Sequence, residues 1–118
     1  MEGDKAALRD GSVFEYCKLN DMVIQAWSVL QFGYFKGNFV GNEKFQQLNQ
    51  VLNRLALKYG VSPSAIAIAW VLRYPAKMQA VVGTTNPKHL IEASQASNVN
   101  LTRKEWYEIY LAAGNDLP

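Results

Sequence analysis

The sequence predicts an α/β fold in which two short parallel strands alternate with helices. Two runs rich in apolar and β-branched residues, 22–30 and 78–82, are each followed by helical patterns. Such alternation is typical of βαβ units, in which neighbouring strands are parallel. The chain has 118 residues, 49% of them hydrophobic, which suits one domain. A sheet of only two strands leaves backbone N–H and C=O groups unpaired at both edges, although both strands are predicted to be buried. The sequence therefore indicates part of a larger structure.

The first third of the chain predicts a helix, a strand and a long loop. Apolar side chains recur at near-helical spacing over residues 12–19, and the helix is expected to end at Asn20 and Asp21. Residues 22–30 are continuously apolar, which is typical of a strand buried on both faces of a parallel sheet. Residues 31–42 contain three glycines and no regular period, so we expect a loop there.

Two consecutive helices are expected next. From Glu43 the apolar residues fall on one helical face, and Gly60 is expected to end this helix in the left-handed conformation. Ser62 suits the N-cap of a second helix and Pro63 its first position. Residues 65–72 are apolar nearly all round, which predicts a helix packed on several sides.

The last third predicts a second buried strand and two more helices. The strand is expected over residues 78–82. Asn86 and Pro87 then begin a helix that is expected to run to about residue 97. Thr102 and Glu105 form a capping box for the final helix.

Composition excludes several classes of function. The net charge is only +2, and the helix after Ser62 has no Arg, Lys, Asn or Gln before Arg73 to contact bases, so nucleic-acid binding is not expected. One cysteine and one histidine exclude a disulfide scaffold and a metal centre. No apolar run reaches the length of a membrane span, and the first residues are not a signal peptide. We therefore expect a cytoplasmic chain without a membrane partner.

The end of the second strand has a pattern that suits an anion. Gly83 stands just before a helix start, where unpaired backbone N–H groups and the helix dipole attract negative charge. Thr84 and Thr85 add hydroxyl groups, and Lys88 and His89 add basic side chains. An ordinary capped helix, with local turns made by Thr and Asn, explains the same pattern. Both interpretations stay open at this point.

The end of the first strand carries Trp27 and Ser28. Ligands bind at the carboxyl ends of parallel strands, where Trp27 could stack on a flat ring and Ser28 could bond a polar group. A core position for Trp27 is the alternative. Glu92, Glu105 and Glu108 are expected on solvated helix faces.

Three blocks, in order, resemble the C-terminal part of the aldo-keto reductases, and most of all bacterial members: IQAWS at 24–28, SPSAIAIAWVLRYP at 62–75 and VVGTTNPKHLIEA at 81–93. The resemblance covers residues 10–118. It implies the C-terminal part of a (β/α)8 TIM barrel, with the two strands as its seventh and eighth. Because a whole barrel needs about 250 residues, residues 1–118 would form a single partial domain without the N-terminal strands, which oligomerisation could complete.

The resemblance implies NADP as the cofactor. Trp27 would stack on the nicotinamide, Ser28 and Leu30 would line the pyrophosphate under loop 31–42, and Glu92 would lie by the adenine. Residues 83–85 would hold the adenosine 2′-phosphate region, with Lys88 and His89 near it. His89 stands where the family often has Arg, which implies a looser contact. The implied cofactor-binding residues are Trp27, Ser28, Leu30, Gly83, Thr84, Thr85, Lys88, His89 and Glu92.

The resemblance implies no catalytic residue in this chain. The family's catalytic Asp, Tyr, Lys and His precede the seventh strand, and residues 1–20 contain no match. We therefore expect an NADP-binding segment of an aldo-keto reductase-like oxidoreductase that is inactive alone. Its expected partner is a second copy or a complementary N-terminal barrel segment. The alternative is a non-catalytic assembly module that pairs through its exposed strand edges.

Overall fold

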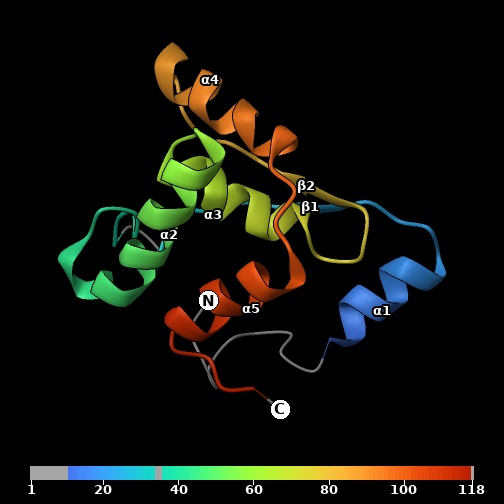
Figure 1. Cartoon of the computed structure of the whole chain (residues 1–118). Coiled ribbons are helices and arrows are strands. Elements are labelled where there is room, and N and C mark those ends of the chain that lie inside the picture. Colours follow the sequence, from blue (N-terminus) through green and yellow to red (C-terminus); the bar gives the residue numbers. More distant parts are fainter. Residues whose placement is uncertain (1–10, 34–35, 118) are drawn as a thin grey trace.

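A computed structural model describes residues 11–33 and 36–117, which form helices around one pair of strands (Figure 1). The elements follow the predicted order. They are α1 (Ser12–Leu19), β1 (Ile24–Ala26), the 3-10 turn η2 (Glu43–Phe45), α2 (Gln46–Tyr59), α3 (Pro63–Leu72), β2 (Met78–Ala80), α4 (Pro87–Ser94), the 3-10 turn η3 (Gln95–Asn98) and α5 (Arg103–Ala112).

β1 and β2 are parallel neighbours, as predicted. The register pairs Ile24 with Met78 and Ala26 with Ala80. The prediction that both strands are buried on both faces is wrong for this chain. Each strand has only three residues, with half-buried ends and an exposed middle residue. These middle residues, Gln25 and Gln79, join by a side-chain hydrogen bond of 3.2 Å on a face that no described element covers.

The helix boundaries follow from local capping. Gly60 ends α2 with φ +67°, a conformation that strains residues with a Cβ atom. The Ser62 hydroxyl accepts a hydrogen bond from the Ala65 N–H and caps α3. Thr102 and Glu105 form the predicted capping box of α5. One expectation needs correction, because the helix that starts at Pro87 does not continue unbroken to residue 97 but tightens into η3 after Ser94.

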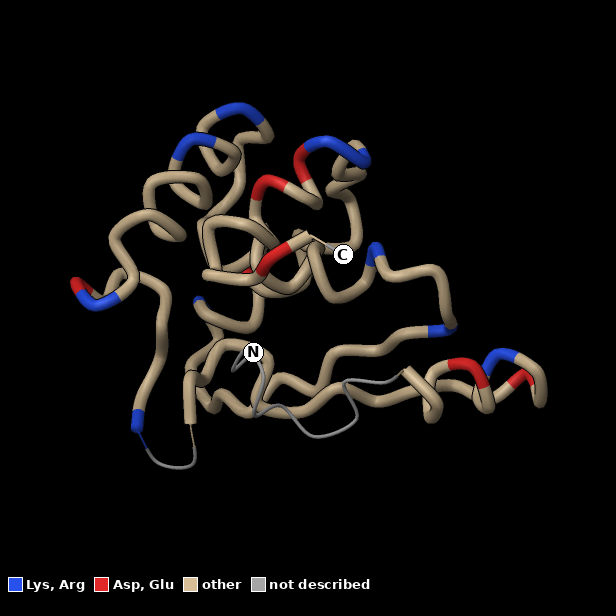
Figure 2. Tube along the Cα trace, turned by 90° about the horizontal axis from the view of Figure 1, so that it is seen from below, with Lys and Arg blue, Asp and Glu red and all other residues tan. Residues whose placement is uncertain are grey.

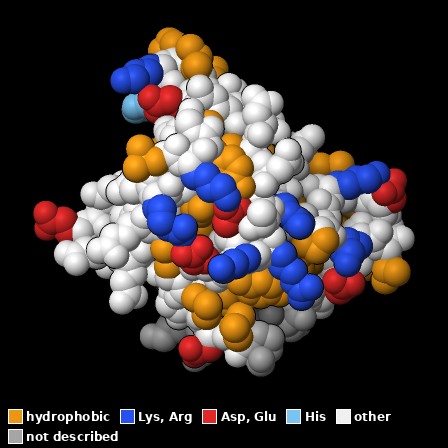
Figure 3. Space-filling view, in the orientation of Figure 1, with side chains coloured by type: hydrophobic (Ala, Val, Ile, Leu, Met, Phe, Trp, Pro, Cys, Tyr) orange, Lys and Arg blue, Asp and Glu red, His pale blue; other side chains and the backbone are white. Residues whose placement is uncertain are grey.

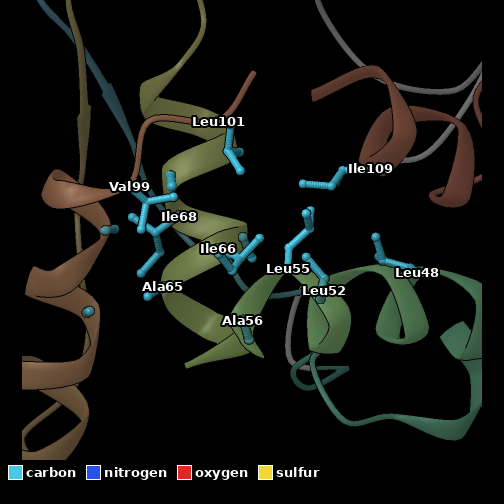
Figure 4. Close-up of a cluster of buried hydrophobic side chains, with 14 residues drawn as sticks. Leu48, Leu52, Leu55, Ala56, Ala65, Ile66, Ile68, Val99, Leu101 and Ile109 are labelled. Atoms are coloured by element: carbon cyan, nitrogen blue, oxygen red, sulfur yellow. The ribbon is translucent and has the colours of Figure 1, made fainter. Parts of the chain in front are cut away.

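The core lies where α2, α3 and α5 meet (Figure 4). Leu52 and Leu55 of α2 and Ile66 of α3 are fully buried, and Ile109 of α5 points toward them. α3 is buried over Ala65–Ala69, as its all-round apolar sequence predicted. The core therefore belongs to the helices and not to the sheet.

Two tryptophans fix α5 against α3. The indole N–H of Trp70 donates to the backbone oxygen of Trp106, and the indole of Trp106 donates to the oxygen of Trp70, each at 3.0 Å. The rings stack with centroids 4.7 Å apart and an interplanar angle of 10°. Because both indole donors and both rings are used, the helices cannot slide past each other without losing all these contacts.

α1 stands apart from the core at the far end of the strands (Figure 1). It has no buried residue. Phe14 contacts the Tyr74 ring at 4.9 Å, and Asp21, just after α1, pairs with Lys77 at 2.6 Å. Few contacts therefore hold α1 to the rest of the described chain.

Charged residues are scattered over most helices, with both signs interspersed (Figure 2). Within residues 11–33 and 36–117, no single helix has both the length and the hydropathy of a membrane span. Residues 43–59 and 63–72 reach that combination only together, across a bend of 93°.

Candidate functional site

The parallel pairing brings the two candidate segments to one edge of the sheet. The Val81 N–H donates to the Ala26 oxygen at 2.8 Å, so the chain leaves β1 and β2 side by side. Trp27 and Ser28 follow β1 directly, and residues 83–89 lie beyond β2 and extend into the first turn of α4. This edge corresponds to the carboxyl ends of the strands, where ligands bind in parallel α/β folds.

Trp27 is exposed at this edge, and 68% of its surface is accessible. The alternative of a core tryptophan is therefore wrong for this chain. The next residue, Ser28, has φ 54°, which is rare for a residue with a Cβ atom. Its carbonyl accepts from the Gln31 N–H at 2.9 Å, so the chain turns sharply just after Trp27. Leu30 is half-buried and packs against the core.

The segment that leads into α4 and the first turn of that helix are open to solvent. Gly83, Thr85, Lys88 and His89 are exposed, and Thr84 is half-buried. Figure 3 shows the single histidine at the outer end of the molecule, beside basic and acidic side chains of α4. The side chains of Thr85, Lys88 and His89 make no hydrogen bond or ion pair with any residue that the structure describes. An anion can therefore reach these groups without displacing another partner.

Local capping accounts for part of the same segment. The Thr84 hydroxyl accepts from the Asn86 N–H at 3.2 Å, and the Asn86 side chain accepts from the Lys88 N–H at 3.0 Å. The capped-helix interpretation is thus correct for these two side chains. It leaves Thr85 and the basic side chains unused, so capping and anion binding are compatible.

Gly83 is a glycine that the fold of this chain does not require. Its φ is not positive, and a Cβ atom added to it would meet nothing within 4 Å. Neither backbone strain nor packing therefore explains the absence of a side chain. Open space above a backbone amide at a helix start fits a phosphate that approaches closely.

Glu92 is half-buried on α4. It lies one helical turn beyond Lys88, on the helix that begins at the open segment. The structure thus groups Gly83, Thr84, Thr85, Lys88, His89 and Glu92 on one connected stretch and sets Trp27, Ser28 and Leu30 on the neighbouring one.

A large apolar hollow of about 610 Å³ lies beside Trp27 and Ser28. Its lining includes Trp27, Ser28, Tyr74, Trp70 and Trp106, but no residue between 83 and 92. Trp27 therefore lines the hollow, whereas the segment 83–89 lies outside it.

Sequence reasoning missed Asn49, whose side chain organises the loop after β1. Asn49 is only 8% exposed. Its Nδ2 lies within 3.1 Å of the backbone oxygens of Phe39, Asn42 and Phe45, and its Oδ1 accepts from the Gly41 N–H at 2.7 Å. A detectable signal exists, because position 49 lies four residues after Phe45 and three before Leu52, on the apolar face of α2.

Glu105 corrects the expectation of a solvated carboxylate, because it is only 6% exposed. It accepts from Lys58 Nζ at 2.5 Å, the Tyr59 hydroxyl at 2.7 Å and the Thr102 N–H at 2.8 Å. Burial raises the pKa of Glu105, but the hydrogen bonds, first of all from Lys58, outweigh it and lower the pKa to about 2. This ionised carboxylate links α2 to α5. Its described partners lie in α2 and at the start of α5, so its role is structural.

No three His, Cys, Asp or Glu side chains of the described chain gather where they could hold a metal ion. The site's chemistry rests instead on amides, hydroxyls, two basic side chains and an exposed indole. This donor set suits a phosphorylated ligand with an aromatic ring.

Comparisons with known proteins agree with the resemblance seen in the sequence. A family model described as the aldo/keto reductase family matches residues 7–112. The 6-dehydroglucose reductase of Agrobacterium fabrum is 38% identical over 94 residues, which cover 78% of this chain and 30% of that protein. A protein of the same name from Novosphingobium aromaticivorans is 29% identical over 94 residues, which cover 79% of this chain and 30% of that protein.

Solved structures give the same result. The crystal structure of a thermostable aldo-keto reductase in complex with the inhibitor epalrestat matches with a TM-score of 0.64 and 25% identity. The match covers 90% of this chain and 34% of that one. The chain thus spans about 30% of the length of the curated relatives it matches.

Proposed function

Because the chain belongs to the aldo/keto reductase family, we propose that it is the NADP-binding C-terminal portion of an aldo-keto reductase-like oxidoreductase. Members of this family generally use NADP(H). One observation carries the proposal: the parallel register of β1 and β2 brings the exposed Trp27 and the open segment 83–89 to one edge. β1 and β2 would then be the seventh and eighth strands of the barrel.

Different residues at this edge would contact different parts of the cofactor. Trp27 offers an exposed indole face to the nicotinamide, and Ser28 and Leu30 border the pyrophosphate. When bound, the nicotinamide supplies the hydride for carbonyl reduction. Thr85 and the amide of Gly83 offer hydrogen bonds to the 2′-phosphate region, and Lys88 adds charge in the first turn of α4.

The remaining implied residues complete the adenosine end. Thr84 keeps its capping bond to Asn86 and orders the turn. His89 is exposed beside Lys88, and Glu92, one turn along α4, would lie by the adenine. In this arrangement the chain binds the cofactor and leaves proton transfer to residues outside it, so we propose that it is inactive alone.

The proposal is tested by calorimetric titration of the 118-residue chain with NADP⁺ and with NAD⁺. We expect NADP⁺ to bind more tightly, because only NADP⁺ carries the 2′-phosphate. Lys88→Met should weaken NADP⁺ binding about fivefold, the size of one exposed charge contact, and leave NAD⁺ binding unchanged. Lys104→Met, an exposed lysine on α5, is the matched control and should change neither.

Two results would refute this function. The absence of binding heat with NADP⁺ at millimolar concentration would show that the chain has no cofactor site. Equal weakening of NADP⁺ and NAD⁺ by Lys88→Met would place the lysine away from the 2′-phosphate. Oxidation of NADPH by the purified chain with a panel of aldehydes would instead refute the proposal that it is inactive alone.

A second candidate function is assembly through the sheet and the hollow. Both strands are only half-buried, and the apolar hollow of about 610 Å³ beside β1 has room for side chains from another chain. We propose a second copy or a complementary N-terminal barrel segment as the partner. Light scattering tests this, since a monomer at all concentrations that ignores an added N-terminal segment would exclude it.

A further inference from the structure

The loop between β1 and α2 is anchored at one buried side chain. We define the post-β1 loop as residues 28–33 and 36–45. The amide of Asn49 contacts this loop at four backbone groups, belonging to Phe39, Gly41, Asn42 and Phe45. Both the NH₂ group and the oxygen of the side-chain amide therefore form hydrogen bonds with backbone groups.

These contacts extend to the start of the loop. The Phe39 N–H donates to the Leu30 oxygen at 3.1 Å, and Gln31 pairs with Asn38 in an antiparallel bridge. Phe32 also donates to the Gly37 oxygen at 3.2 Å. The two arms of the loop thus form a small ladder, so the residue that fixes Phe39 also fixes Leu30.

Asn49 contributes little to α2 as a helix residue. Asparagine has a low helix propensity, and a polar group on a buried face is costly unless its hydrogen bonds are made. Leucine or alanine would suit the position between Phe45 and Leu52 better by both criteria. The loop contacts are what compensate for an amide at this place.

We propose that Asn49 is a positioning residue that orders the post-β1 loop in advance for the cofactor. The inference rests on the proposed function, because the loop carries Ser28 and Leu30 at the edge where NADP would bind. A loop that is already ordered loses less conformational freedom on binding, so the affinity is higher. Asn49 acts through the loop and not by contact with the ligand.

Two measurements on the whole chain test the proposal. Hydrogen exchange without ligand follows amides of residues 36–45 and, as reference, amides of α3. Fluorescence titration with NADPH gives the affinity. The variants are Asn49→Ala, which removes all four contacts, and Asn49→Asp, which keeps the acceptor for Gly41 and loses the donor. Asn53→Ala, an exposed asparagine one turn further along α2, is the matched control.

We expect exchange in residues 36–45 to become at least tenfold faster in both Asn49 variants, while α3 changes less than twofold. NADPH should bind about tenfold more weakly, which corresponds to about 1.4 kcal/mol. Asn53→Ala should change neither quantity.

Unchanged exchange in the loop would overturn the proposal, and so would a loosened loop with unchanged NADPH affinity. Loss of protection in α3 in both variants would also overturn it, because Asn49 would then support the whole fold and not the loop. If the unaltered chain does not bind NADPH, the proposed function and the cofactor role of Asn49 both fail. Loop exchange alone then decides whether Asn49 orders the loop.

Discussion

Replacing Glu105 with glutamine should destabilise the chain at neutral pH and have little effect in acid. Glutamine can keep the capping bond to the Thr102 N–H, because the capping box accepts either residue. It loses the negative charge that accepts from Lys58 Nζ. The substitution therefore isolates the charged part of the interaction.

The pKa sets the size of the effect. A carboxyl with a pKa of about 2 in the folded chain and an ordinary value of 4.5 contributes up to about 3 kcal/mol to stability at neutral pH. Solvent screens part of this, because the Lys58 side chain is 58% exposed. We therefore expect Glu105→Gln to lower the free energy of unfolding by about 1–2 kcal/mol at pH 7.

The pH dependence has a definite sign. Because the pKa of Glu105 is lower in the folded chain, its contribution is present above pH 4.5 and is lost as the pH falls toward about 2. Urea unfolding followed by tryptophan fluorescence at pH 7, 4.5 and 3 measures it. The wild-type and Glu105→Gln curves should converge in acid. Glu108→Gln, which removes the negative charge that pairs with the exposed Arg54, is the control and should cost under about 1 kcal/mol. A gap of equal size at pH 7 and pH 3 would refute the reasoning.

Further predictions concern packing and backbone conformation. Leu52→Ala should cost about 2–5 kcal/mol in urea unfolding, because Leu52 is fully buried, whereas Leu57→Ala on the same helix should be nearly neutral, because Leu57 is 86% exposed. Equal losses of unfolding free energy in the two variants would contradict the assignment of Leu52 to the core. Gly60→Ala should cost about 1–2 kcal/mol, since its φ of +67° strains any Cβ atom. Gly83→Ala should leave unfolding unchanged and weaken NADP⁺ binding in calorimetry, because open space surrounds it. An unchanged NADP⁺ affinity would contradict close approach of a phosphate there.

Local signals in the sequence were sufficient for the starts of α3 and α5 and for the end of α2, but not for the end of α4. Gly60, Ser62 and Thr102 end or begin helices through groups within a few residues of themselves, so their neighbours in sequence determine the outcome. The burial of the strands was not predictable in this way. An apolar run shows what a strand can bury, but what covers it depends on other elements, and no described element covers Gln25 and Gln79.

The same difference separates the segment that begins at Gly83 from the buried Glu105. The order Gly83, Thr84, Thr85 before a helix start is local, and its capping follows from the sequence. Glu105 is different, because its partners Lys58 and Tyr59 lie more than 45 residues away, and only the folded chain brings them together. The family resemblance extended the interpretation beyond local signals and is confirmed by the family match.

The face-to-face indoles of Trp70 and Trp106 also give the chain a built-in optical marker. Indoles stacked with centroids 4.7 Å apart are close enough to couple their electronic transitions, so the near-ultraviolet circular dichroism of this pair depends on α5 staying packed against α3. The third tryptophan, Trp27, is exposed just after β1 and contributes separately to emission. Docking of the C-terminal helix and occupancy of the sheet edge can therefore be followed in one unlabelled sample.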